Sequence, residues 1–258
     1  MVSPSSATSR DGFLGNQLLI DQPRSGSHRS GLDAVLLAAS LSEGSTGHVV
    51  DLGAGVGVAG LAVAYRLPEV TVTLVEIDPD LARLARGNAM LNAAVGDRAH
   101  VVTADVLAPA AERQAAGLTD NMADHVIMNP PFHLADRGRS SPAPARARAH
   151  ALNVDAMDGW IRAAAALLKP SGTLTVIFRA DELPRLLDAI GTRVGSLSLL
   201  PVHAHAGEPA HRLILRGKPQ GRAPLRLLPA LVLHAHDGSF RPDVEIVLRG
   251  TALQTDWW

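Results

Sequence analysis

The segment Asp51-Leu52-Gly53-Ala54-Gly55-Val56-Gly57 follows a short apolar run and opens a helical pattern. Glycines at alternate positions let the backbone turn tightly and come close to a bound ligand, because side chains there would collide with it. Loops of this kind after a buried strand serve several classes of cofactor in α/β proteins. We therefore expect Gly53, Ala54, Gly55 and Gly57 to line a cofactor site.

Outward from this loop, short apolar runs alternate with longer helical patterns, which is typical of a parallel sheet covered by helices on both faces. The expected strands are residues 48–52, 70–77, 100–103, 124–128 and 173–178, and the expected helices are residues 31–41, 58–67, 79–92, 155–168 and 181–190. Residues 197–202 and 213–216 are strand-like without room for a helix between them, so they should pair antiparallel. The pattern predicts an α/β fold with a seven-stranded, mostly parallel sheet and an antiparallel C-terminal strand.

The composition excludes several kinds of chemistry. The chain of 258 residues has no cysteine, so it cannot form disulfides, thiol nucleophiles or cysteine-based zinc sites. Hydrophobic residues at 47% and charged residues at 19% are typical of a soluble globular protein, and no apolar run approaches the length of a membrane span. The polar N-terminus lacks the apolar centre of a secretory signal. We expect a flexible tail at residues 1–24, a single domain at residues 25–258 and a cytoplasmic location.

Three acidic residues stand where expected strands end. Asp51 precedes the first glycine by two residues, where its carboxylate could hold the cationic amino group of a methionine moiety. Glu76 could accept both hydroxyls of a ribose, and Asp105 could accept from the amino group of adenine. Ligands of open α/β sheets bind at the carboxyl ends of adjacent strands. These three residues and their neighbours Ile77 and Val106 therefore predict a cofactor that combines adenosine with an amino acid.

An alternative cofactor must be weighed against this one. Gly55, Gly57 and Gly60 also fit the Gly-x-Gly-x-x-Gly pattern of dinucleotide-binding proteins, with Glu76 about twenty residues further on. The carboxylate of Asp51 would repel a pyrophosphate, whereas it would attract the amino group of a methyl donor. The sign of this charge favours the methyl donor.

The expected fourth strand ends in Asn129-Pro130-Pro131-Phe132. An amino nitrogen conjugated to a ring or carbonyl is a poor nucleophile, and it improves when acceptors bond its hydrogens. The Asn129 side-chain oxygen and the Pro130 carbonyl could accept the two hydrogens. Pro130 and Pro131 restrict the backbone, and Phe132 offers a face on which a planar group can stack. The motif predicts methylation of a planar amine without a metal or a covalent intermediate.

Together these motifs resemble those of class I methyltransferases that methylate amino groups. The resemblance extends from Ser25 to about Lys218, and residues 51–57, 76–78, 105 and 129–132 match the motifs of that group position by position. It implies a Rossmann-like fold, with S-adenosyl-L-methionine as the cofactor and Asn129 beside both cofactor and acceptor.

A narrower resemblance lies before the first strand. Residues 27–38 look like the corresponding segment of bacterial adenine-N6 methyltransferases that act on valine tRNA. Because residues of this segment cover the cofactor in those enzymes, the resemblance places Arg29 and Asp33 on the cofactor side. The expected reaction is methyl transfer to an exocyclic amino nitrogen, N6 of adenine in a tRNA.

Two related enzyme groups share the Asn-Pro-Pro-aromatic motif. Protein glutamine-N5 methyltransferases more often have Tyr at the position of Phe132, and ribosomal RNA guanine-N2 methyltransferases often show Phe-His, as at Phe132-His133. The guanine enzymes usually carry a second, degenerate copy of the domain, and the glutamine enzymes carry a helical N-terminal domain. This chain has room for neither, which favours the tRNA hypothesis. A cofactor-sensing or RNA-binding protein without activity is disfavoured because the donor and acceptor motifs are both intact.

RNA contacts are expected to be local, because the net charge of the chain is only −1. Four arginines after the acceptor motif lie in a stretch without acids, and we expect them to contact the substrate RNA: Arg137, Arg139, Arg146 and Arg148. The alternative is a solvated loop without a binding role.

Two pairs of histidines have a spacing that metal ligands can use. His203 and His205, and again His234 and His236, would each share one face of a strand. Because no carboxylate pattern completes either pair, we expect no metal site.

Overall fold

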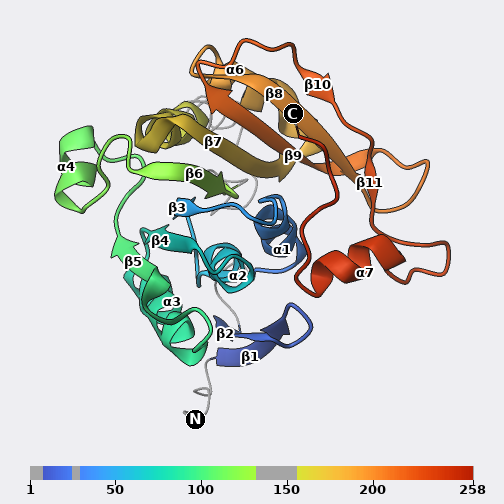
Figure 1. Cartoon of the computed structure of the whole chain (residues 1–258), viewed down its shortest axis with the longest axis horizontal. Coiled ribbons are helices and arrows are strands. Elements are labelled where there is room, and N and C mark those ends of the chain that lie inside the picture. The colour runs from blue at the N-terminus through green and yellow to red at the C-terminus, as the bar shows by residue number, and fades with distance from the viewer. Residues whose placement is uncertain (1–7, 25–29, 132–155, 258) are drawn as a thin grey trace, which may run out of the picture.

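The computed structural model describes residues 8–24, 30–131 and 156–257, and these form the expected α/β architecture (Figure 1). The described strands of the main sheet are β3 (Gly47–Leu52), β4 (Val70–Glu76), β5 (Ala99–Thr103), β6 (Ala123–Met128), β7 (Leu168–Arg179), β8 (Val194–His203), β9 (Ala210–Pro219), β10 (Arg226–Leu227) and β11 (Leu231–Val232). The described helices are α1 (Leu32–Ala39), α2 (Val58–Arg66), α3 (Pro79–Leu91), α4 (Ala110–Ala115), a helix at 156–167, α6 (Leu183–Ile190) and α7 (Pro242–Leu248).

Nine described strands form this sheet in the order β10-β8-β9-β7-β6-β3-β4-β5, and β11 pairs with β8. Strands β7, β6, β3, β4 and β5 are mutually parallel, and β9 runs antiparallel between β7 and β8. The expected mostly parallel sheet with an antiparallel C-terminal strand is therefore confirmed. The two short strands β10 and β11 extend it beyond the seven that the sequence pattern predicts.

Helices cover both faces of the sheet, and each face has its own apolar core (Figure 1). On one face, α1, α2 and α7 pack with side chains such as Val49 and Ile127. On the other face, the helix at 156–167 and α6 pack with Val50 and Val126. Adjacent strand residues thus contribute to opposite cores, because side chains alternate across a strand. This is why the central strands are nearly continuous apolar runs rather than alternating ones.

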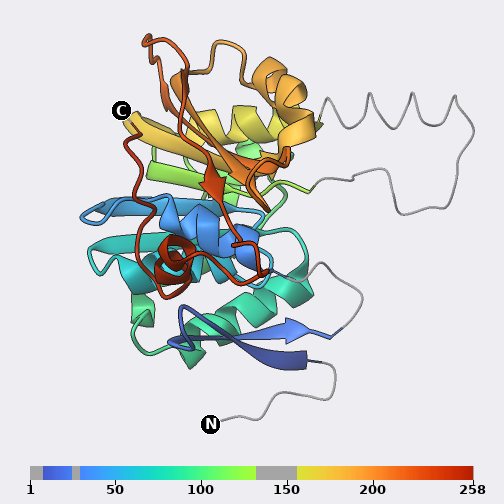
Figure 2. The same ribbon diagram turned by 90° about the vertical axis from the view of Figure 1, so that its right-hand side faces the viewer.

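The expected flexible tail at residues 1–24 differs from the structure over residues 8–23. Strands β1 (Thr8–Phe13) and β2 (Leu18–Pro23) form an antiparallel hairpin that lies against α3 (Figure 2). Leu18 and Ile20 are fully buried in the core. Strand β2 gave only a weak signal in the sequence, because its apolar residues form the short run Leu18-Leu19-Ile20, and the alternation of buried residues along it is seen only in the structure. It was missed because the partner surface comes from residues more than 60 positions away, as the bond between Leu19 and Asn92 illustrates.

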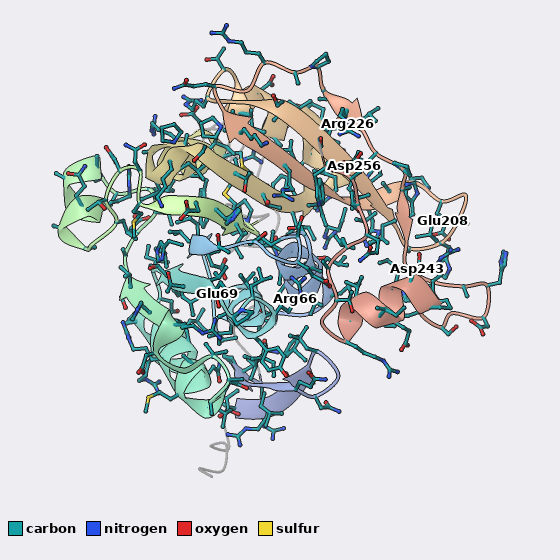
Figure 3. The ribbon with its side chains drawn as sticks, viewed as in Figure 1. Arg66, Glu69, Glu208, Arg226, Asp243 and Asp256 are labelled. Carbon is teal, nitrogen blue, oxygen red and sulfur yellow. The ribbon has the colours of Figure 1, made fainter. Side chains whose placement is uncertain are left out.

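The C-terminal segment, which had no assigned role, packs into the same core. Trp257 is buried, its carbonyl accepts a hydrogen bond from Ser198 Oγ, and its ring lies 5.2 Å from the guanidinium of Arg216. An Arg226–Asp256 ion pair holds the segment beside β10 (Figure 3). The tryptophan therefore acts as an anchor that closes the open end of the core.

Arg66 connects the end of α2 to two other segments (Figure 3). Its guanidinium donates to the carbonyls of Ala38 and Leu41 at the end of α1, and to the carbonyl of Gly250 after α7. Helix ends leave carbonyls without partners inside the helix, and the partly buried Arg66 satisfies them here. Burial lowers the pKa of Arg66.

Local differences from the expected elements are small. Strand β7 begins at Leu168 rather than Thr173, and the extra residues form an irregularity between Ala123 and His125 in the pairing with β6. Helices α4 and α7 were not assigned from the sequence. Asp78 caps α3 as expected, because its carboxylate accepts from the backbone N–H groups of Asp80 and Leu81. In the part of the chain that the structure describes, no helix is long and apolar enough to cross a membrane.

Candidate functional site

The sheet brings the motif residues together at one edge. Strands β6, β3, β4 and β5 are parallel neighbours, and Leu52 of β3 lies in register with both Met128 of β6 and Val75 of β4. The residues that follow these strands, from the glycine loop to Asn129, therefore leave the sheet side by side. Because carboxyl ends of parallel strands meet at the same edge, the expected donor and acceptor motifs are adjacent.

The glycine loop is held by backbone hydrogen bonds from its neighbour strand. The N–H groups of Gly53 and Ala54 both donate to the Val75 carbonyl at 2.9 Å. Gly53 and Gly55 have φ values of +72° and +58°, a region that favours glycine. A Cβ on Gly53 would lie 2.6 Å from the ring of Trp160, whereas a Cβ on Gly55 would meet open space. Gly53 is thus required by protein packing, and Gly55 leaves the space that a ligand needs.

Glu76 connects two loops through its carboxylate. Its Oε2 accepts from Gly55 N at 2.8 Å, and its Oε1 accepts from Asp78 N at 2.9 Å. Each carboxylate oxygen has a second acceptor position. Glu76 is therefore fixed in place and still able to accept two hydroxyls, which fits its expected role toward a ribose.

Asp51 is the most deeply buried acid of the site, with 2% of its surface exposed. Its Oδ2 accepts from Gly60 N at 2.9 Å, a contact with α2 that the sequence did not indicate. Burial raises the pKa of Asp51 to about 7, and the charge of Glu76 adds to this rise. A cationic ligand group beside Asp51 would favour the charged carboxylate again. The buried acid therefore fits the expected ammonium group.

The expected adenine end is open and partly apolar. Asp105 is exposed and its Oδ1 accepts from Leu107 N at 2.8 Å, whereas Val106 is buried. Ile77 and Leu107 expose 60% and 41% of their surfaces. Two exposed apolar side chains beside an acid suit a planar ring with an amino group. Leu107 was not predicted, although an apolar residue two positions after Asp105 was the available signal.

The acceptor motif contains a polar atom that has no partner in the part of the chain that the structure describes. Asn129 Oδ1 is buried and accepts no hydrogen bond from the described residues. Pro130 is buried and Pro131 is exposed at the end of the same loop. A buried oxygen without a donor costs about 1–3 kcal/mol, a cost that a bound amine would remove. This orphaned oxygen fits the role that the sequence assigns to Asn129.

Asp33 has a protein partner that the sequence did not indicate. Its Oδ2 accepts from Nε of Arg212 at 2.9 Å, an ion pair between α1 and β9. Strand β9 is antiparallel to β7, so its beginning lies at the same sheet edge as the motifs. A role for Asp33 toward the cofactor remains a prediction.

Several predicted residues lie outside the described residues, namely Arg29, Phe132, Arg137, Arg139, Arg146 and Arg148. The histidine pairs are described, and the rings of His205 and His234 lie 5.4 Å apart. Within residues 8–24, 30–131 and 156–257, no group of three or more histidines or acids could hold a metal ion.

Comparisons with known proteins show similarity to methyltransferases in sequence and in fold. A profile of the family described as methyltransferase small domain matches residues 29–194. A tRNA1(Val) (adenine(37)-N6)-methyltransferase from Porphyromonas gingivalis is 31% identical over 224 residues, covering 83% of this chain and 85% of that protein. A protein of the same name from Aeromonas hydrophila is 29% identical and covers 89% of this chain and 92% of its own length. The crystal structure of a predicted O-methyltransferase from Agrobacterium tumefaciens matches 86% of this chain and 97% of its own, with 35% identity and a TM-score of 0.72.

Asp51 should make the stability of the ligand-free protein depend on pH. Its pKa in the folded protein, about 7, lies above the ordinary value of 3.8, so the folded state binds this proton more tightly than the unfolded state. The stability from this proton is complete below about pH 4 and is lost as the pH rises toward 7. We expect Asp51→Asn to avoid this loss and to gain roughly 1.4 kcal/mol on the wild type for each pH unit in this window. Urea unfolding at about pH 5, 6 and 7 measures the difference, and a constant difference would contradict the assignment.

Proposed function

Because the chain belongs to the methyltransferase small domain family and its cofactor is S-adenosylmethionine, we propose that it methylates N6 of an adenine in a tRNA. The observation that carries this proposal is the buried oxygen of Asn129, directly after β6, which has no hydrogen-bond partner among the described residues. It lies in the loop that leaves the sheet beside the glycine loop. An acceptor for an amine hydrogen thus stands next to the donor site.

Different residues of the chain bind the cofactor and activate the amine. Glu76 and Asp105 accept hydrogen bonds from the adenosine part of the cofactor, and Asp51 favours its ammonium group. The bound cofactor supplies an electrophilic methyl group on a positively charged sulfur. Asn129 Oδ1 and the Pro130 carbonyl accept the two N–H hydrogens of adenine, which directs the nitrogen lone pair toward the methyl carbon. Transfer of this methyl group would replace one hydrogen of the amine, and the released proton would pass to water.

An amine fits this site better than a hydroxyl. A hydroxyl acceptor has a single hydrogen and needs a base to remove it. An amide oxygen and a neighbouring carbonyl instead match the two hydrogens of an exocyclic amine. For this reason we favour an amino acceptor, although the Agrobacterium structure is described as that of a predicted O-methyltransferase.

The choice of tRNA over other amine substrates rests on the relatives and on the residue types that follow the motif in the sequence. The Porphyromonas and Aeromonas proteins are named for an adenine in valine tRNA. An adenine in a folded tRNA must leave its stack to reach the site, and Phe132 would stack on the extruded base. The four arginines of residues 137–148 would contact the neighbouring phosphates. A tRNA substrate would place the enzyme in the cytoplasm.

The product nucleoside tests the proposed reaction. Purified protein with labelled S-adenosylmethionine and unmodified bulk tRNA should yield N6-methyladenosine, identified by mass spectrometry after digestion to nucleosides. Ribosomal RNA and a release factor serve as competing substrates. Label found in N2-methylguanosine, in N5-methylglutamine or on an oxygen would replace the proposal with the corresponding activity.

Asn129 should act on the reaction and not on cofactor binding. We expect Asn129→Ala to keep its affinity for S-adenosylmethionine while single-turnover methylation falls by about a hundredfold or more, because an oriented polar group at the reacting nitrogen is lost. Calorimetry and rates at saturating tRNA separate the two effects. A full rate in Asn129→Ala would mean that the amide is only part of a turn.

The arginines after the motif should bind tRNA phosphates. Replacing Arg137, Arg139, Arg146 and Arg148 with alanine should weaken tRNA binding whatever the sequence, and each lost contact should reduce the slope of log affinity against log salt by about one. Exposed Arg222 offers a control substitution in a different part of the chain. An unchanged slope in the quadruple variant would show that these arginines do not contact the tRNA and would favour the alternative, a solvated loop without a binding role.

A further inference from the structure

The turn from the glycine loop into α2 is held by two side chains. If α2 were continued by one turn toward its N-terminus, the Gly60 N–H would donate to the Val56 carbonyl, four residues earlier. In the structure the Gly60 N–H donates to Asp51 Oδ2, and the Val56 carbonyl accepts from Asn88 Nδ2 at 3.0 Å. The backbone is thus free to turn at Gly57, which caps the helix with a φ of +92°.

Asn88 also holds the N-terminal hairpin. It lies in α3 with 1% of its surface exposed, its Oδ1 accepts from Asp21 N at 2.8 Å, and its Nδ2 donates to the Asp21 carbonyl at 3.1 Å. One carboxamide therefore joins β2, α3 and the glycine loop. A buried group with all its hydrogen bonds made fixes the position of each partner.

Asn92, the residue that caps the C-terminal end of α3, provides an internal comparison four positions after Asn88. Its Oδ1 accepts from Leu19 N at 2.9 Å and its Nδ2 donates to the Leu19 carbonyl at 2.8 Å, so it holds the same strand in the same way. Its remaining bond goes to the Asn88 carbonyl, within the helix itself. The two asparagines differ in one respect, which is that only Asn88 reaches the glycine loop.

We propose that Asn88 is a positioning residue for the cofactor, which transmits the docked position of the hairpin to the glycine loop through the Val56 carbonyl. The hairpin then influences the shape of the cofactor site through Asn88, without contacting the cofactor through this residue. Without the Asn88 bond, the Val56 carbonyl has lost its hydrogen-bond donor. The backbone of the Gly53–Gly57 loop then shifts away from the conformation that leaves space at Gly55.

The test compares Asn88→Ala with Asn92→Ala. Each variant loses both amide bonds to β2, so we expect similar falls in Tm. Only Asn88→Ala should raise the Kd for S-adenosylmethionine, by about tenfold, whereas Asn92→Ala should stay within about twofold of the wild type. Titration calorimetry on the folded variants, at a temperature well below each Tm, measures the two Kd values. The KM for S-adenosylmethionine should rise with the Kd while kcat at saturating cofactor is retained.

Equal loss of affinity in both variants would show that hairpin docking alone matters, and unchanged affinity in both would show that the loop keeps its shape without Asn88; either result overturns the proposal. Should Asn88→Ala fail to fold, Asn88→Asp retains the acceptor for Asp21 N and removes the donors, and the same rise in Kd is expected. This proposal depends on S-adenosylmethionine being the cofactor. It does not depend on tRNA being the methyl acceptor, because the titration contains no tRNA. Wild-type protein that bound no S-adenosylmethionine would refute the cofactor itself.

Discussion

The Glu76 carboxylate is the contact on which the rest of the site depends. It accepts backbone hydrogen bonds from Gly55 and Asp78, which lie in the loops after two different strands. Without Glu76 these two N–H groups would lose this acceptor, and a single acid satisfies both. The same acid remains available to a ligand because each oxygen has a second acceptor position. In the proposed site, Glu76 would therefore both hold two loops and bind the cofactor.

Near Glu76, two buried polar groups are in energetically unfavourable environments that a bound ligand would make more favourable. The pKa of Asp51 is raised by burial, and the Asn129 oxygen is buried without a donor from the described residues. Both conditions are unfavourable in the ligand-free protein, because buried charge and unpaired polar atoms are costly. The surrounding sheet and its two apolar cores hold these groups in place. Such preorganised groups act more strongly on a bound ligand than groups that must rearrange first.

Much of this arrangement could be predicted from local sequence. Residues 51–57 predicted the glycine-rich turn after β3, and the apolar runs before Asp51, Glu76 and Asn129 predicted the strands that bring these residues to one edge. The hairpin at residues 8–23 was missed because a two-stranded ribbon gains its stability from packing on α3, a partner distant in sequence. Leu107 and Arg212 were missed for a similar reason, since neither belongs to a motif and each is brought to the site edge by the chain path.

The sequence by itself determined the α/β class and the glycine loop after β3, and it predicted the acidic and amide groups of the proposed site, because glycine spacing and strand periodicity are local properties of the chain. Only the tertiary structure decided how these groups are held. Gly60 gives Asp51 a partner, Arg212 pairs with Asp33, and Asn88 joins the hairpin to the loop. Hydrogen bonds of this kind connect residues that are 9, 179 and 32 positions apart. Their partners are fixed by the packing of helices on the sheet, which no local pattern specifies.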